Sequence, residues 1–261
     1  MISAILLLPI IILIVLKGGV FLFAGMLALC SAIGIAEFYR MAMPTRKMEL
    51  WLAAITGTAL LFLPLADNDK LIVSAIGLLF TGFSLLFLFR IRSIDTAASE
   101  VAFALLAFLY IPFMLMHLVQ LRQTPFGIEW ILVIMLIVMT NDSAAYYSGS
   151  AFGKHRLYPL VSPKKSVEGA IGGLIGSIGG TMLAKFTFFP QLTFTDAILM
   201  ALVVGMAGQA GDLFESLLKR SFRVKDSGSI IPGHGGILDR LDSILFAAPV
   251  TYYYVLFFFR G

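Results

Sequence analysis

Long apolar runs separated by short polar stretches dominate the chain. The runs are continuous rather than alternating, which predicts helices and argues against membrane-spanning strands. Most are long enough to cross a hydrocarbon layer of about 30 Å as helices. The expected helices lie near residues 2–16, 19–40, 50–66, 71–89, 101–121, 129–150, 167–189, 195–217 and 240–259. The pattern predicts an all-α polytopic membrane protein with about nine transmembrane helices.

Composition supports this prediction and excludes a water-soluble protein. The chain is 59% hydrophobic and 13% charged, whereas a soluble domain has about 25% charged residues. The only cysteine, Cys30, cannot form a disulfide within one chain. The first run lacks a basic segment and a small-residue cleavage site, so we expect a retained helix and not a signal peptide.

The basic residues gather in alternate loops. The loops after the second, fourth, sixth and eighth expected helices hold 14 of the 19 lysines and arginines. By the positive-inside rule, this side of the membrane is cytoplasmic. The N-terminus would then be cytoplasmic, and nine helices would place the C-terminus outside. The 14 residues are Arg40, Arg46, Lys47, Arg90, Arg92, Lys154, Arg156, Lys164, Lys165, Lys219, Arg220, Arg223, Lys225 and Arg240.

The two halves of the chain differ in the polarity of their helices. Residues 1–125 have almost no charge within the expected helices, and we expect the exception, Glu37, to pair with Arg40 at i+3 near the interface. The second half has intramembrane carboxylates, which are costly and usually functional. We therefore expect one integral membrane domain, residues 1–261, with an apolar scaffold half (1–125) and a catalytic half (126–261).

A polar stripe marks the eighth expected helix. Asp212, Glu215, Ser216 and Lys219 are spaced at i, i+3, i+4 and i+7, so they share one helix face. Such a face must point into the helix bundle or a water-filled cavity. The alternative is an internal Asp–Lys pair that only fixes helix packing.

The loop 220–236 and the turn after it have the chemistry of a phosphate site. The loop combines basic residues with glycines, which bring backbone N–H groups close to an anion. The last helix opens with Asp239, Arg240 and Asp242, and carboxylate oxygens suit Mg²⁺ beside substrate phosphates. A plain cytoplasmic loop and a proton or cation pathway are the competing interpretations.

The loop between the sixth and seventh expected helices adds further phosphate ligands. Lys164 and Lys165 are point charges for phosphates, and Ser162 could cap a helix or bind a ligand. Glu168 could bind substrate or only favour the dipole of the next helix. Asp142 lies near the expected end of its helix, where an anion is disfavoured, so we expect it to bind a cation or a ribose.

Two glycine patterns bear on nucleotide binding. Gly172, Gly176 and Gly180 are spaced by four residues, which predicts close helix packing. They are not a dinucleotide fingerprint because no strand precedes them, and a P-loop motif is absent.

The segment 216–242 resembles the motif of the phosphatidate cytidylyltransferase family, the CDP-diacylglycerol synthases. It reads Ser-x-x-Lys-Arg-x4-Lys-Asp-x-Gly-x2-Ile-Pro-x-His-Gly-Gly-Ile-x-Asp-Arg-Leu-Asp. Residues 142–146 and 162–169 resemble the upstream motifs of the family, with Ser166 where threonine is expected. The first half of the chain resembles the family only as generic membrane spans.

The resemblance implies an enzyme that converts CTP and phosphatidic acid to CDP-diacylglycerol and pyrophosphate in phospholipid biosynthesis. It implies Mg²⁺ on Asp212 and Asp239, a potassium ion beside it, and a homodimer. We expect CTP, phosphatidic acid and membrane lipids as partners, no nucleic acid, and a site facing the cytoplasm from a bacterial inner membrane. The expected catalytic residues are Lys219, Arg220, Lys225, Asp226 and Asp242. The expected substrate-binding residues are Asp142, Ser162, Lys164, Lys165, Glu168, Ser216, His234 and Arg240.

Three alternatives remain open at this point. A CTP-dependent cytidylyltransferase or kinase could act on another membrane lipid. A cation or proton transporter predicts two related halves, whereas these charges fall only in the second half. An inactive scaffold would not need the complete set of motif residues.

Overall fold

The computed structural model describes residues 2–66, 68–230 and 235–260. The chain forms two compact units, which are described separately. Unit 1 comprises Met1–Gln120 and Asp226–Leu238, and unit 2 comprises Leu121–Lys225 and Asp239–Gly261. A segment of the motif, residues 226–238, thus groups with the first half of the chain.

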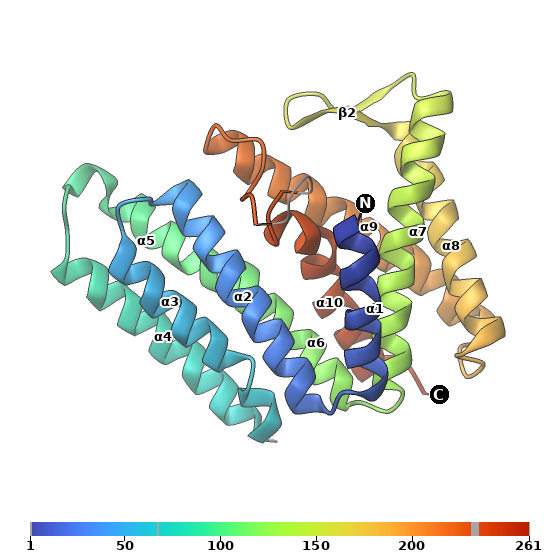
Figure 1. Ribbon diagram of the computed structural model, residues 1–261, viewed down its shortest axis with the longest axis horizontal. Helices are drawn as coiled ribbons and strands as arrows, with labels where there is room; N and C mark the ends of the chain where they lie inside the picture. The colour runs from blue at the N-terminus through green and yellow to red at the C-terminus, as the bar shows by residue number, and fades with distance from the viewer. Residues whose placement is uncertain (1, 67, 231–234, 261) are drawn as a thin grey trace. The chain divides into compact units, whose positions relative to one another are not determined.

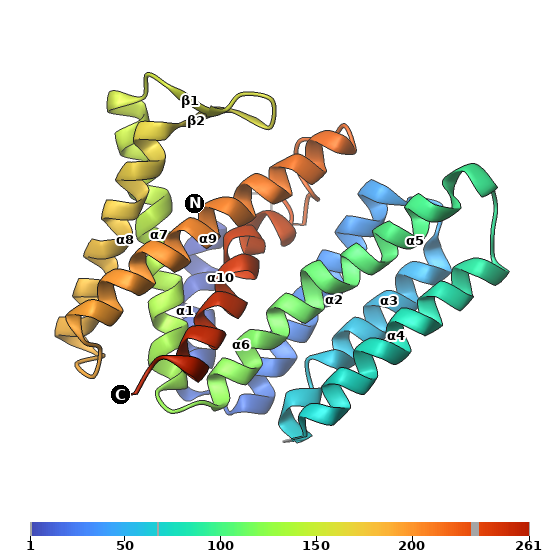
Figure 2. The same ribbon diagram turned by 180° about the vertical axis from the view of Figure 1, so that it is seen from behind.

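Unit 1 is built from apolar helices, of which α2 to α5 lie side by side (Figures 1 and 2). Helix α5, the π-helical turn η2 and helix α6 follow one another without a break from Ile94 to Gln123, and η2 contains Pro112. Proline lacks the N–H that would continue the α-helical ladder, which accounts for the altered turn. The elements are α1 (Ile2–Lys17), α2 (Val20–Ala42), α3 (Lys47–Leu60), η1 (Leu63–Ala66), α4 (Asp69–Phe89), α5 (Ile94–Phe108), η2 (Leu109–Phe113) and α6 (Met114–Gln123).

A buried arginine joins the two basic loops of unit 1. The side chain of Arg46, only 1% exposed, pairs with Glu49 at 3.1 Å and also with Glu100. It donates a hydrogen bond of 2.8 Å to the carbonyl oxygen of Arg90, in the α4–α5 connection. The α2–α3 and α4–α5 connections therefore lie at the same end of unit 1, as the alternation of basic loops predicted.

Unit 2 contains a helical hairpin with a small sheet at its tip. Helix α7 (Gly127–Phe152) and helix α8 (Val167–Thr187) are connected by strands β1 (Arg156–Tyr158) and β2 (Ser162–Ser166), which pair antiparallel. Helices α9 (Phe194–Ser221) and α10 (Leu238–Phe257) complete the unit (Figure 1), although Leu238 itself groups with unit 1. The sequence did not predict this sheet because its strands are short and polar.

Glycines allow α8 to pack directly on α7. A Cβ atom at Gly172 would lie 2.0 Å from Ser148 Oγ, and one at Gly176 would lie 2.4 Å from the Cβ of Ala144. A Cβ at Gly180 would lie 2.6 Å from Thr140 Oγ1. The prediction that this glycine stripe serves close helix packing is confirmed.

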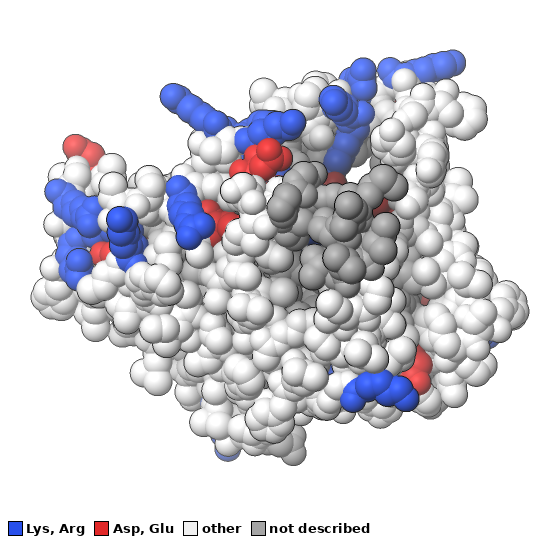
Figure 3. All heavy atoms as spheres, viewed as in Figure 1, with Lys and Arg blue, Asp and Glu red and all other residues white. Residues whose placement is uncertain are grey.

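All nine expected runs are helical, and the all-α polytopic class is confirmed. In the described residues, seven helices are long and apolar enough to cross a membrane. Two expected spans are outside this group: α1 has 16 residues, and α10 begins with charged residues. The number of transmembrane helices stays a prediction. Figure 3 shows that residues other than lysine, arginine, aspartate and glutamate cover most of the visible face.

Candidate active site

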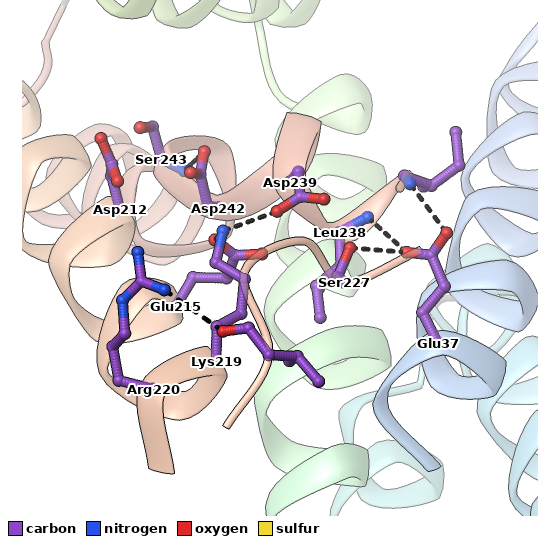
Figure 4. Close-up of polar contacts among 12 residues, drawn as sticks. Glu37, Asp212, Glu215, Lys219, Arg220, Ser227, Leu238, Asp239, Asp242 and Ser243 are labelled. Atoms are coloured by element: carbon purple, nitrogen blue, oxygen red, sulfur yellow. Dashed lines mark hydrogen bonds and ion pairs between the residues drawn. The ribbon is translucent and has the colours of Figure 1, made fainter. Parts of the chain in front are cut away.

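An ion-pair cluster joins α9 to α10 in unit 2. Nζ of Lys219 lies 2.6 Å from Oδ1 of Asp239 and also forms an ion pair with Glu215, one turn earlier on α9 (Figure 4). Glu215 is fully buried, and an unpaired buried charge is costly, so Lys219 stabilises both carboxylates.

Asp212 pairs with a lysine outside α9 and not with Lys219 of the same helix. Its Oδ2 lies 2.5 Å from Nζ of Lys165, at the end of the β-hairpin. This ion pair brings the basic α7–α8 connection to the C-terminal half of α9. The alternative of an internal Asp212–Lys219 pair is therefore wrong.

Three carboxylates from three helices lie within electrostatic range of one another. Asp142 of α7 and Asp242 of α10 both interact repulsively with Asp212 and with each other, while Lys165 and Arg240 attract Asp142. Asp142 is not at the end of its helix, since α7 continues to Phe152. The helix-dipole argument for Asp142 is thus wrong, but its placement beside Asp212 gives it a new role as part of an acidic cluster.

A cavity of about 530 Å³ opens beside this acidic cluster. Its walls come from α7, the β-hairpin, the first turn of α8 and α9, and they bring basic groups into one lining with Asp142 and Asp212. This volume is in the range of small-molecule sites, about 300–1,000 Å³. The polar residues that line it are Asn141, Asp142, Tyr146, Ser150, Arg156, Lys164, Lys165, Ser166, Gln209 and Asp212.

Two amides in the cavity lining connect three helices. Nε2 of Gln209 donates to Oδ1 of Asn141 at 3.1 Å and to the carbonyl oxygen of Ala170 at 2.9 Å. Nδ2 of Asn141 donates to Oγ of Ser177 at 2.9 Å. Sequence reasoning assigned no role to either amide, although a polar amide within a membrane helix is itself a signal. Arg156 and Tyr146 of the cavity wall were missed as well.

The β-hairpin is fixed to α8 by two polar side chains. Ser166 is the N-cap of α8 and accepts a hydrogen bond of 3.1 Å from the N–H of Gly169. Glu168 accepts hydrogen bonds from the N–H of Lys154 at 3.1 Å and from Nδ1 of His155 at 2.7 Å. Glu168 therefore holds the start of the loop, and it is not among the residues that line the cavity.

The structure distributes the remaining predicted residues around these features. Ser162 lies on β2 opposite Tyr158, outside the cavity lining, and Ser216 is half-buried on α9. Asp242 accepts a hydrogen bond of 2.6 Å from the N–H of Ser243. Arg220 is exposed and donates to the carbonyl oxygen of Val224 at 3.4 Å.

The loop residues divide between the two units. Lys225 and Arg240 are exposed in unit 2, and Asp226 is exposed in unit 1. His234 lies outside the described residues. Among the predicted residues, the structure thus brings Asp142, Lys164, Lys165 and Asp212 to one cavity, and Lys219 and Asp239 to one ion-pair cluster.

The donor set of unit 2 fits a divalent cation that also contacts a phosphate. Within the described ranges, no three His, Cys, Asp or Glu side chains are arranged to hold one ion. Mg²⁺ in phosphate sites commonly takes one or two carboxylates, with waters and phosphate oxygens as its other ligands. The mutual repulsion of Asp142, Asp212 and Asp242 would be relieved by such an ion.

Comparisons with known proteins agree with this chemistry. The family described as "Cytidylyltransferase family" matches residues 1–258. The chain is similar to the "Phosphatidate cytidylyltransferase" of Staphylococcus epidermidis RP62A, with 35% identity over 91% of this chain and 90% of that protein. It is 36% identical to the protein of the same name from Staphylococcus aureus COL, over 91% of this chain and 90% of that protein. The Bacillus subtilis 168 protein of that name is 38% identical over 61% and 60%.

Proposed function

The chain belongs to the cytidylyltransferase family, and on this premise we propose that it transfers the cytidylyl group of CTP to phosphatidic acid. The products would be CDP-diacylglycerol, a precursor in phospholipid biosynthesis, and pyrophosphate. The observation that carries the proposal is the cavity in unit 2, which is lined by Asp142 and Asp212 together with Arg156, Lys164 and Lys165. The names of the relatives supply the lipid substrate.

The reaction needs charge neutralisation more than an activated nucleophile. An oxygen of the phosphatidic acid monoester forms a bond to the α-phosphorus of CTP. The bond from that phosphorus to the oxygen bridging the β-phosphorus breaks, and pyrophosphate leaves with the electron pair. A phosphate monoester is already nucleophilic, so positioning and electrostatics are the main contributions of the protein.

The basic residues of the cavity suit the triphosphate. Arg156 lies on β1 and Lys164 on β2, and both line the cavity. Among the described residues neither is paired with a buried carboxylate, so each can bind an anion without breaking such a pair. Lys165 is bound to Asp212, so it would offset phosphate charge while it orients that carboxylate. Arg220 and Lys225 are exposed and remain proposed contacts for pyrophosphate or the lipid phosphate.

Lys219 has a different proposed role. It is held between Glu215 and Asp239 and is largely buried, so we assign it to positioning Asp239. Asp242, in the same turn of α10, would orient basic side chains and add negative charge near Asp212.

The proposed metal ion is Mg²⁺, held by Asp212 and Asp239, with Asp142 and Asp242 as neighbouring carboxylates. When bound, Mg²⁺ would neutralise phosphate charge and polarise the reacting phosphoryl group. Each of the two proposed ligands forms an ion pair with a lysine, Asp212 with Lys165 and Asp239 with Lys219, so a bound ion would share or replace these contacts. The potassium ion implied by the family resemblance, and the homodimer, stay predictions.

We place the protein in the inner membrane of a bacterium, with the cavity facing the cytoplasm. The support is the positive-inside rule, because the α7–α8 connection and the end of α9 with the loop after it carry most of the basic residues of unit 2. CTP would then enter from the cytoplasm, while the acyl chains of phosphatidic acid would stay in the bilayer.

One assay tests the proposed reaction. Purified protein in detergent receives labelled CTP, Mg²⁺ and one lipid: phosphatidic acid, diacylglycerol or a polyprenol phosphate. We expect labelled CDP-diacylglycerol and stoichiometric pyrophosphate only with phosphatidic acid. Product with either rival lipid instead, or none with phosphatidic acid, would overturn the proposal.

A further inference from the structure

A buried carboxylate of unit 1 binds the loop that contains most of the motif. Glu37 lies on α2, where its side chain is 1% exposed. Its Oε2 accepts hydrogen bonds from Oγ of Ser227 at 3.1 Å and from the N–H of Leu238 at 2.9 Å. Its Oε1 accepts one from the N–H of Ile237 at 3.0 Å (Figure 4). The predicted pair with Arg40 is therefore wrong.

Two glycines of the motif enclose the same carboxylate. A Cβ atom at Gly228 would lie 2.6 Å from Oε1 of Glu37. A Cβ at Gly236 would lie 2.4 Å from Oε2 of Glu37 and 2.3 Å from Oγ of Ser227. Only glycine lets the loop backbone approach the carboxylate this closely. These two motif glycines thus have a structural reason that does not require a phosphate.

The three hydrogen bonds come from both ends of the loop. Ser227 lies near the start of the segment, and Ile237 and Leu238 end it at the start of α10. The first N–H groups of a helix have no partner within the helix, and negative charge is favourable there. Glu37 supplies an acceptor and a charge to these groups from a helix that is distant in sequence.

A buried carboxylate at position 37 would be energetically unfavourable if it served only to pack α2. A carboxylate within a membrane helix is costly, and an apolar side chain would fill the same space without that cost. An ionised carboxylate has enough acceptor sites for all three donors, so the charge is compensated by the loop. The gain is a fixed loop geometry directly before Asp239 in the chain.

We propose that Glu37 is a positioning residue that holds residues 227–228 and 236–238 in place and, through Leu238, sets the start of α10. Asp239 and Asp242 follow in that first turn, so the orientation of both depends on where α10 begins. This inference rests on the proposed cytidylyl transfer for its activity readout. Glu37 itself contacts no substrate in this proposal.

The first test measures the loop directly. Hydrogen exchange of a peptide covering Gly235–Leu241 is followed by mass spectrometry in Glu37→Gln and in wild type. A glutamine presents an N–H₂ group where one carboxylate oxygen was an acceptor. Loss of a charged hydrogen bond is expected to raise exchange of the Ile237 and Leu238 amides about tenfold. Unchanged exchange would overturn the proposal, whatever the activity assay shows.

The second test separates positioning from binding. Glu37→Gln should lower kcat about tenfold, because the misaligned fraction of enzyme cannot react, while KM for CTP changes less than about threefold. Ser31→Ala is the matched control: it alters another buried polar residue of α2 and should leave both parameters at the wild-type level. An unchanged kcat in Glu37→Gln, or an equal loss in Ser31→Ala, contradicts the proposal.

A double-mutant cycle tests whether Gly228 acts through Glu37. Gly228→Ala should reduce kcat because its Cβ displaces the carboxylate. In Glu37→Ala the space is vacated, so adding Gly228→Ala should change kcat by less than about twofold. Fully additive losses would contradict the contact. If Glu37→Ala does not fold, the cycle uses Ser227→Ala with Glu37→Gln, which removes one hydrogen bond and should also be non-additive.

The two proposals fail in different ways. If wild type makes no CDP-diacylglycerol, the proposed function fails, but the exchange experiment still tests Glu37. If wild type is active and the exchange of Ile237 and Leu238 does not respond to Glu37→Gln, only the positioning role fails.

Discussion

Lys219 Nζ lies 2.6 Å from Oδ1 of Asp239, and this ion pair joins the C-terminal half of α9 to the first turn of α10. The same ammonium group neutralises Glu215, which is fully buried. One cation therefore stabilises two carboxylates, one of which is a proposed metal ligand. Stability and chemistry are coupled at this position.

Replacing Lys219 should lower the stability of the folded protein. Lys219→Met leaves Glu215 and Asp239 without their shared cation, and breaking a buried pair costs about 3 kcal/mol or more. We expect a clearly lower Tm in detergent and loss of activity. Lys164→Met, an exposed lysine of the cavity wall, should keep the wild-type Tm and lose activity only. Equal Tm values for the two variants would contradict the shared role of Lys219.

Removing the charge of Asp239 should affect activity far more than folding. Asp239→Asn keeps an oxygen that can accept a hydrogen bond from Lys219, so Tm should fall only slightly. Loss of a carboxylate ligand should reduce kcat at least about 100-fold, as expected for a group that neutralises transition-state charge. Asp95→Asn, in the exposed first turn of α5, is the control and should be fully active. Near-normal turnover by Asp239→Asn would rule out its proposed role.

The glycine stripe of α8 offers a matched pair of substitutions. Gly176→Ala places a Cβ 2.4 Å from Cβ of Ala144 and 2.7 Å from the carbonyl oxygen of Thr140. Overpacking of this kind costs about 1–3 kcal/mol. A Cβ at Gly179, on the same helix, would meet nothing within 4 Å, and alanine there should stabilise the helix by up to about 1 kcal/mol. Thermal unfolding of both variants should show shifts of opposite sign.

Sequence patterns predicted the helices and the glycine packing because both are local and periodic. The stripe on α9 was placed correctly, but its partners were not, because Asp212 pairs with Lys165 and Lys219 with Asp239 across helices. Arg46 was counted as a topological charge, whereas it is buried among Glu49 and Glu100. Helical periodicity cannot reveal such contacts.

Glu37 shows the same limit most clearly. Its predicted partner was one turn away on the same helix, yet its observed hydrogen bonds reach residues 227, 237 and 238. The signal in the sequence was the cost of a carboxylate in an apolar helix, which required a compensating group without naming it. The sequence also showed glycines at positions 228 and 236, but the prediction was that they bring the loop backbone close to a phosphate.

Magnesium removal gives the last prediction and separates the metal from the fold. Chelation with EDTA should abolish turnover, and added Mg²⁺ should restore it, because the proposed reaction depends on neutralising phosphate charge. The Tm should fall only modestly, since the ion relieves carboxylate repulsion but Asp212 and Asp239 pair with Lys165 and Lys219 in the metal-free protein. Lys165→Gln removes the lysine that pairs with Asp212, so the Mg²⁺ activation curve of this variant should shift. The control Lys47→Gln, in unit 1, should have the Mg²⁺ activation curve of wild type. Full activity in EDTA, or identical Mg²⁺ curves for Lys165→Gln and wild type, would contradict a metal site at Asp212.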